Sequence, residues 1–209
     1  TTHLFSSAAS DVYKRQQLIK GFALVSSLIT FVLSAVLLFQ FDFSSADKLQ
    51  LGNKISWIKS INANYEIGID GISLPLLVLS TFITVLAIIY SIEHLPEPKS
   101  PKGFLALILV LETGMNGTFV ALDLILFFVF FEIVLLPMYF MIGIWGDKTV
   151  RTVSGFKNQI ETRLYASIKF FVFTLFGSAF MLLGFLGLYY RGNKTFSIPE
   201  LIELGTSGA

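Results

Sequence analysis

The most prominent pattern along the chain is a series of long apolar runs separated by polar segments. A helix that crosses a bilayer needs about 20 consecutive, mainly apolar residues. Scanning with this length predicts an all-α membrane protein with five transmembrane helices. They are expected at residues 18–39, 74–92, 103–122, 124–145 and 164–190.

The third and fourth predicted helices come from one apolar stretch. Residues 103–145 contain only three charged residues, Glu112, Asp123 and Glu132. The stretch is too long for one span and has the right length for two, so Asp123 is expected at the turn. Its carboxylate can accept hydrogen bonds from the first backbone N–H groups of the following helix. The pattern predicts a tight helical hairpin.

The remaining segments divide the chain further. Residues 1–16 are predicted to be a non-native or disordered leader, residues 17–195 the transmembrane part, and residues 196–209 a polar loop at which a longer protein is truncated. Residues 40–72 are also read as a polar loop. Residues 146–163 are rich in Lys and Arg, so the positive-inside rule places this loop in the cytoplasm.

Composition and charge exclude several classes of function. The chain is 54% hydrophobic and 14% charged, with a mean hydropathy of +0.74 and a net charge of +1, so it has no basic surface for nucleic acid. It contains no Cys, and its only histidines are His3 and His94, which excludes disulfides, iron–sulfur clusters and structural zinc. No nucleotide-binding glycine motif is present. What remains is membrane chemistry without a cofactor in this chain.

Three ionisable residues fall inside the predicted spans and are the candidate site residues. A charge in hydrocarbon costs a few kcal/mol, so Glu112, Glu132 and Lys169 mark either a polar pathway or partners within the bundle. Counting from a turn at Asp123, both glutamates lie roughly 14–17 Å deep. Two carboxyl groups at one depth are candidates for proton transfer. The alternative is that each is protonated and only fixes helix packing.

Two further features rank these candidates. Pro137 follows Glu132 by five residues and cannot donate to the carbonyl of Ile133, which predicts a kinked or distorted stretch beside that carboxyl. We therefore favour Glu132 for proton transfer and regard Glu112 as a candidate relay. Lys169 is a second candidate relay, about 8 Å inside its helix, where a lysine can also simply extend to the interface.

Four stretches resemble a known family. They are residues 121–146 (ALDLILFFVFFEIVLLPMYFMIGIWG), 68–74 (GIDGISL), 163–171 (RLYASIKFF) and 194–201 (KTFSIPEL). Together they resemble the chain M or subunit 4 family of NADH–quinone oxidoreductase, the antiporter-like membrane subunits of respiratory complex I. The resemblance extends over roughly residues 18–204.

The resemblance implies a fold and a mechanism. The family has fourteen helices, and the five spans here resemble its helices two to six. Glu132 matches the glutamate that transfers protons together with lysines on later helices, which lie beyond Ala209. NADH, FMN, iron–sulfur clusters and quinone are then expected in partner subunits, with no cofactor in this chain. The expected partners are the other membrane subunits of complex I and the lipid bilayer, with no nucleic acid.

Alternatives to this function stay open. Multisubunit sodium/proton antiporters share the glutamate, so the site alone does not separate the two families. The isolated fragment is also expected to be an inert helical scaffold, because the enzymatic activity belongs to the parent complex. The expected location is the bacterial inner membrane, with the mitochondrial inner membrane as the alternative.

Overall fold

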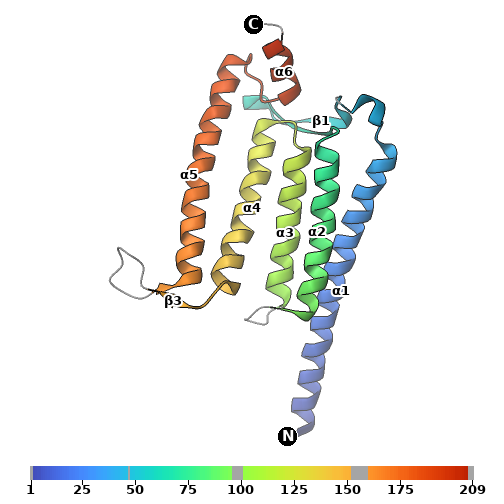
Figure 1. Cartoon of the computed structure of the whole chain (residues 1–209), viewed down its shortest axis with the longest axis vertical. Helices are drawn as coiled ribbons and strands as arrows, with labels where there is room; N and C mark the ends of the chain where they lie inside the picture. Colours follow the sequence, from blue (N-terminus) through green and yellow to red (C-terminus); the bar gives the residue numbers. More distant parts are fainter. Residues whose placement is uncertain (1, 47, 96–100, 152–159, 207–209) are drawn as a thin grey trace.

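Five long helices make up most of the structure. The computed structural model describes residues 2–46, 48–95, 101–151 and 160–206. The helices lie side by side in chain order (Figure 1), as α1 (Thr2–Gln40), α2 (Ser73–Glu93), α3 (Pro101–Val120), α4 (Leu124–Trp145) and α5 (Thr162–Arg191). Each is long and apolar enough to cross a membrane, in α1 over Gln16–Gln40. The predicted all-α membrane fold with five spans is confirmed.

The first helix includes the predicted leader. The backbone of α1 is helical from Thr2 onward and continues into the first span without a break. That residues 1–16 are a non-native or disordered leader stays a prediction.

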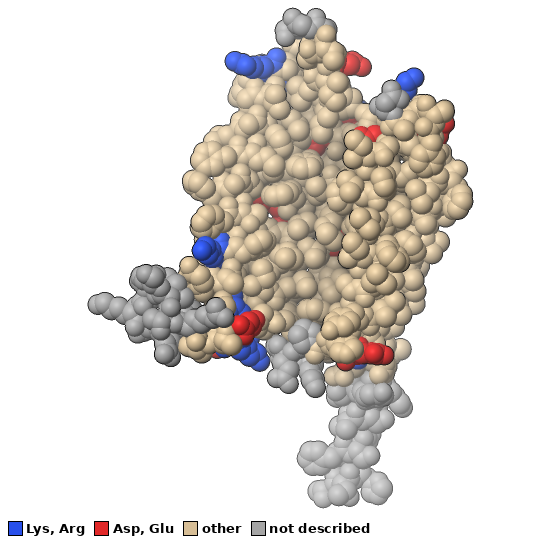
Figure 2. Space-filling view, viewed as in Figure 1, with Lys and Arg blue, Asp and Glu red and all other residues tan. Residues whose placement is uncertain are grey.

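The core of the bundle lies where α1, α2 and α3 meet. Near one end of these helices, Ala23 of α1, Ile88 of α2 and Leu105 and Ile108 of α3 form a buried apolar cluster. A second cluster near the other end contains Phe41, Ile69, Leu74 and Leu77, with Val120 packed against it. The outer surfaces of the helices are apolar and exposed, and Figure 2 shows the charged side chains mainly near the two ends of the molecule. This is the distribution expected when lipid or further helices surround the bundle.

Asp123 forms the turn between α3 and α4, as predicted. It is fully buried, and its Oδ1 accepts hydrogen bonds from the backbone N–H groups of Ile125 (2.9 Å) and Leu126 (3.2 Å). Its Oδ2 accepts a third bond, from the backbone N–H of Asn64 (2.9 Å). One carboxylate therefore caps α4 and also holds the segment between α1 and α2 against the turn.

The segment between α1 and α2 was predicted to be a polar loop, and this prediction is wrong. Strands β1 (Gln50–Ile58) and β2 (Ala63–Ile69) form an antiparallel hairpin. A short 3-10 helix at Phe43–Ser45 precedes β1, and a second one at Lys59–Ile61 connects the two strands. The hairpin lies across one end of the helices (Figure 1). The chain turns at Asn62, whose φ of 52° lies in the left-handed region that Asn tolerates.

The C-terminal segment also differs from its prediction as a polar loop. Helix α6 (Ile198–Thr206) forms there, and Phe196 just before it is 1% exposed and stacks on Tyr189 of α5 with ring centroids 4.4 Å apart. The backbone N–H of Leu124 donates to the carbonyl of Phe196, and that of Ile198 donates to the carbonyl of Leu122. The α3–α4 turn thus lies between β2 and residues 195–198 like a short central strand.

The opposite end of the bundle carries the basic connection between α4 and α5. Short strands β3 (Val150–Arg151) and β4 (Ile160–Glu161) pair just before α5. Arg163 donates through Nη1 to the carbonyl of Ile144, at 2.8 Å, which ties the start of α5 to the end of α4. Lys157, one of the basic residues behind the predicted cytoplasmic position of this loop, lies outside the described residues.

Candidate functional site

Glu132 lies in the middle of α4. It follows the first residue of the helix by eight positions, which places it about 12 Å from that end. Helix α4 continues through Pro137 without interruption. Because proline has no N–H, the carbonyl of Ile133, the residue after Glu132, nevertheless lacks its i+4 donor. The proline does not interrupt the helix, and the kink predicted beside Glu132 stays a prediction.

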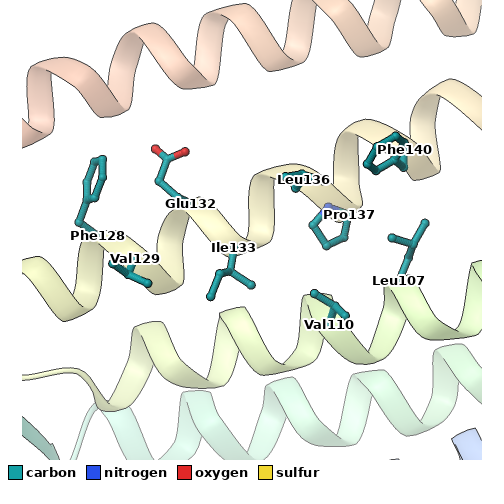
Figure 3. Close-up of a pocket in the computed structure, with 9 residues that line it drawn as sticks. All are labelled: Leu107, Val110, Phe128, Val129, Glu132, Ile133, Leu136, Pro137 and Phe140. Atoms are coloured by element: carbon teal, nitrogen blue, oxygen red, sulfur yellow. The ribbon is translucent and has the colours of Figure 1, made fainter. Parts of the chain in front are cut away.

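A groove of about 480 Å³ runs along α4 beside Glu132. Except for Glu132, its lining side chains are apolar: Leu107 and Val110 from α3, and Phe128, Val129, Ile133, Leu136, Pro137 and Phe140 from α4. In Figure 3 the carboxyl group of Glu132 points away from α3, on the same side of the helix as Phe128. Its Oε1 is buried and has no hydrogen-bond partner among the described residues. The site is a carboxyl group in an apolar surrounding with unused hydrogen-bonding capacity.

Glu112 lies at a similar depth on the neighbouring helix. It precedes the last residue of α3 by eight positions, as Glu132 follows the start of α4 by eight, and the two helices are antiparallel. The two carboxyl groups do not face each other, however. Gly114 and Gly117 mark the side of α3 that packs on α4, against Phe130. Glu112 instead continues the buried stripe of Leu105 and Ile108, which faces α1 and α2.

Lys169 is exposed on the outer face of α5. Its Nζ lies over the rings of Tyr165 (5.6 Å to the centroid) and Phe173 (5.9 Å), one turn to either side. The opposite face of α5 packs on α4, where Ser167 is 1% exposed and approaches Gly143. Because residues two positions apart lie on roughly opposite sides of a helix, Lys169 points away from α4. The structure therefore does not bring Lys169 together with Glu132.

The three candidates thus occupy three different surroundings. Glu132 lines a groove on α4, Glu112 is 3% exposed among α1, α2 and α3, and Lys169 faces outward. Leu107 and Val110 of α3, which help to line the groove, were missed in the sequence. Leucine and valine in an apolar span carry no signal that separates a groove from the bundle interior.

Two family models match the chain, one on each side of the α3–α4 turn. The model described as "NADH-ubiquinone oxidoreductase chain 4, amino terminus" matches residues 8–118. The model described as "NADH:quinone oxidoreductase/Mrp antiporter, TM" matches residues 121–208. Together they account for nearly the whole chain.

Three curated relatives show the similarity at the level of sequence. The chain is 41% identical to NADH-ubiquinone oxidoreductase chain 4 of Mycosarcoma maydis, over 88% of its own length and 35% of the relative's. It is 37% identical to F(420)H(2) dehydrogenase subunit M of Methanosarcina mazei, over 90% and 36%. It is 35% identical to NADH-quinone oxidoreductase subunit M of Rickettsia typhi, over 90% and 35%. The chain spans about a third of the length of these relatives.

Two solved structures share the fold at low sequence identity. A chain of the Mrp complex from a Dietzia species superposes with a TM-score of 0.69 at 16% identity, over 89% of this chain and 18% of the other. A chain of the membrane-bound sulfane sulfur reductase, an archaeal respiratory membrane complex, gives a TM-score of 0.62 at 19% identity, over 87% and 25%. At such identities the likeness establishes the fold alone.

Proposed function

Because the chain belongs to the chain 4 or subunit M family of NADH–quinone oxidoreductases, we propose that it is part of a proton-translocating membrane subunit in which Glu132 carries the proton. The observation that supports this most directly is the buried, unpartnered Oε1 of Glu132 in an apolar groove. A carboxyl group in such a place exchanges its proton only when water or a charged partner reaches it. That dependence is what a gated proton carrier requires.

The chemistry needs a second group that changes the proton affinity of Glu132. A cation that approaches favours the carboxylate, and a cation that withdraws favours the protonated acid. Among the described residues no lysine or arginine hydrogen-bonds to Oε1 of Glu132. The resemblance implies lysines on later helices for this role. On this proposal the isolated chain of 209 residues transports no protons, and liposomes containing it show no proton flux.

The partners and cofactors follow from the same proposal. The chain would assemble with the other membrane subunits of a respiratory complex I-type enzyme in the bacterial plasma membrane. NADH, FMN, iron–sulfur clusters and quinone would be bound by partner subunits. This chain would contribute neither a redox group nor a contact to nucleic acid. Its part in the oxidoreductase reaction is therefore proton transfer coupled to quinone reduction elsewhere in the complex.

A subunit of a multisubunit sodium/proton antiporter is the second candidate function. It is favoured by the family description that names the Mrp antiporter and by the fold shared with the Mrp complex. The relatives named as NADH-quinone oxidoreductase subunits favour the first candidate.

Vesicles that contain the intact parent complex separate the two functions. Proton uptake driven by quinone reduction, without dependence on sodium, is the result expected for the proposal. Proton movement driven by a sodium gradient in the absence of an electron donor would contradict it. Glu132→Gln is expected to lower the proton uptake, whereas Leu136→Ile, a shape change in the same groove without a titratable group, is expected to preserve it.

A further inference from the structure

Three buried polar atoms without hydrogen-bond partners lie on α2 and α3, on the side away from Glu132. They are Oγ of Ser80, Oε1 of Glu112 and Oδ1 of Asn116, and no described residue bonds to any of them. Each unpaired buried polar atom is costly, and such atoms are rare in folded proteins unless water or an ion satisfies them. Several together therefore call for a common explanation.

The packing of α2 against α3 brings these atoms to neighbouring levels. Ile88 of α2 packs with Leu105 and Ile108 of α3 near one end of the interface. Leu77 and Val120 belong to the cluster near the other end. In this antiparallel register Ser80 of α2 lies level with Asn116 of α3, and Thr84 lies level with Glu112. Glu112 and Asn116 are one helical turn apart on the same face.

The surrounding hydroxyl groups offer few donors. Ser27 of α1 and Thr84 of α2 donate to carbonyls of their own helices, Leu24 at 3.0 Å and Ser80 at 3.0 Å. Further along α1, the hydroxyl group of Ser34 forms a hydrogen bond of 2.7 Å with the hydroxyl group of Thr81 across the α1–α2 interface. All four hydroxyl groups are buried, and each has a protein partner. The hydroxyl groups of Ser27, Ser34, Thr81 and Thr84 are therefore already engaged, and the carboxyl oxygen of Glu112, the amide oxygen of Asn116 and the hydroxyl of Ser80 are left without partners among the described residues.

Apolar side chains close this polar region at both ends. The cluster of Ala23, Ile88, Leu105 and Ile108 lies on one side of it, and the cluster that contains Leu74 and Leu77 lies on the other. Glycines of α3 separate it from the Glu132 groove, because they pack directly on α4. Lys20 of α1 donates a hydrogen bond of 2.8 Å to the carbonyl of Ile92 of α2, beyond the first of these clusters. The ammonium group of Lys20 therefore does not serve the polar region.

We propose that the α1–α2–α3 interface contains an enclosed water-binding site, in which ordered water bridges Glu112, Asn116 and Ser80. Water supplies the missing donors, since one molecule makes two to four hydrogen bonds and buried waters occupy polar sites of this kind. The site gives Glu112 a local partner for its proton on the face of α3 opposite Glu132. Glu112 then exchanges its proton within this site and not with Glu132. This inference does not depend on the proposed function.

Cryo-electron microscopy of the intact parent complex, at a resolution that shows water, tests the site directly. The expected result is water density within about 3 Å of Glu112 and Asn116. A map that resolves these side chains and shows them bonded only to protein, or a dry interface, would overturn the proposal.

The melting temperature of the purified complex provides an independent test. In a hydrated site Ser80→Ala removes a bond to water and is expected to lower the melting temperature. In a dry site the same substitution removes an unpaired hydroxyl and raises it or leaves it unchanged, which would contradict the proposal. Asn116→Leu is expected to displace water and to lower the melting temperature further. Thr113→Ala, at an exposed position of α3 next to Glu112, is the matched control and is expected to change little.

Discussion

Glu112 and Glu132 lie at nearly the same depth on adjacent antiparallel helices, yet they face opposite sides of the pair. The two carboxyl groups are separated because they lie on different sides of their helices, and not because they lie at different depths along the helix axes. Gly117 and Phe130 occupy the space between the helices, so neither carboxyl group points into the α3–α4 contact. A mechanism in which the two glutamates share one proton directly is therefore inconsistent with the geometry.

The close α3–α4 contact leads to a prediction at Gly117. A Cβ atom added there would overlap the ring of Phe130, so Gly117→Ala is expected to destabilise the protein by about 1–3 kcal/mol through overpacking. Gly184 of α5 has nothing within 4 Å of an added Cβ. Gly184→Ala is therefore the matched control and is expected to be neutral or slightly stabilising. Melting temperatures of the two purified variants check this, and equal shifts would contradict the contact.

Asp123 holds two parts of the structure through one side chain. Asp123→Ala removes the cap of α4 and leaves the buried N–H of Asn64 without its acceptor, which is expected to cost roughly 2–4 kcal/mol. Asp123→Asn keeps one amide oxygen and should cost less. Denaturant unfolding of the variants measures the difference. An Asp123→Ala variant as stable as the natural chain would show that the turn is held by other contacts.

The sequence was sufficient for the spans but not for the ends of the bundle. Apolar runs predict helices well because their length and composition are decided locally. Strand β1 was missed because its residues are almost all exposed and show no clean alternation. The hairpin depends on distant contacts, such as that between Asn64 and Asp123, and these are not visible in a local pattern.

The candidate site was predictable only in part, for a related reason. The depth of each glutamate in the membrane follows from the number of residues between it and the turn at Asp123. This count placed Glu112 and Glu132 at similar depths. The direction in which each carboxyl group points depends on the rotation of its helix about the axis. For α3 this rotation is indicated by the buried Leu105 and Ile108 on one side and by the glycines on the other. Ser80 and Asn116 went unnoticed because single small polar residues in an apolar span resemble tolerated exceptions. The contacts of these two side chains depend on neighbouring helices, which a local sequence pattern does not show.

An ion pair between the hairpin and α6 predicts a dependence on pH. Lys54 of β1 donates to Glu200 of α6 at 2.7 Å, and this hydrogen bond lowers the pKa of Glu200, with a further bond from Thr195. A lowered pKa in the folded state stabilises the protein above the unfolded pKa of about 4.3. The stabilisation is lost as the pH falls through the folded pKa.

We therefore expect the attachment of α6 to weaken in acid. Hydrogen exchange of the α6 amides should accelerate as the pH falls below about 4 in the natural chain, after correction for intrinsic exchange. This pH-dependent step should be smaller in Lys54→Gln, in which only the bond from Thr195 still lowers the pKa of Glu200. Lys59→Gln, at an exposed lysine close in sequence, is the control and should behave like the natural chain. An unchanged pH profile in Lys54→Gln would rule out the ion pair as the cause.

The measurement that tests the central claim most directly is the number of protons taken up per quinone reduced, in vesicles containing the parent complex with Glu132→Gln. The amide preserves the shape and part of the hydrogen bonding of the side chain but cannot titrate. We predict that the complex assembles and that proton uptake per quinone is lost or strongly reduced, whereas Glu112→Gln retains most of it. Normal proton uptake with Glu132→Gln, or a larger loss with Glu112→Gln, would contradict the assignment of Glu132 as the proton carrier.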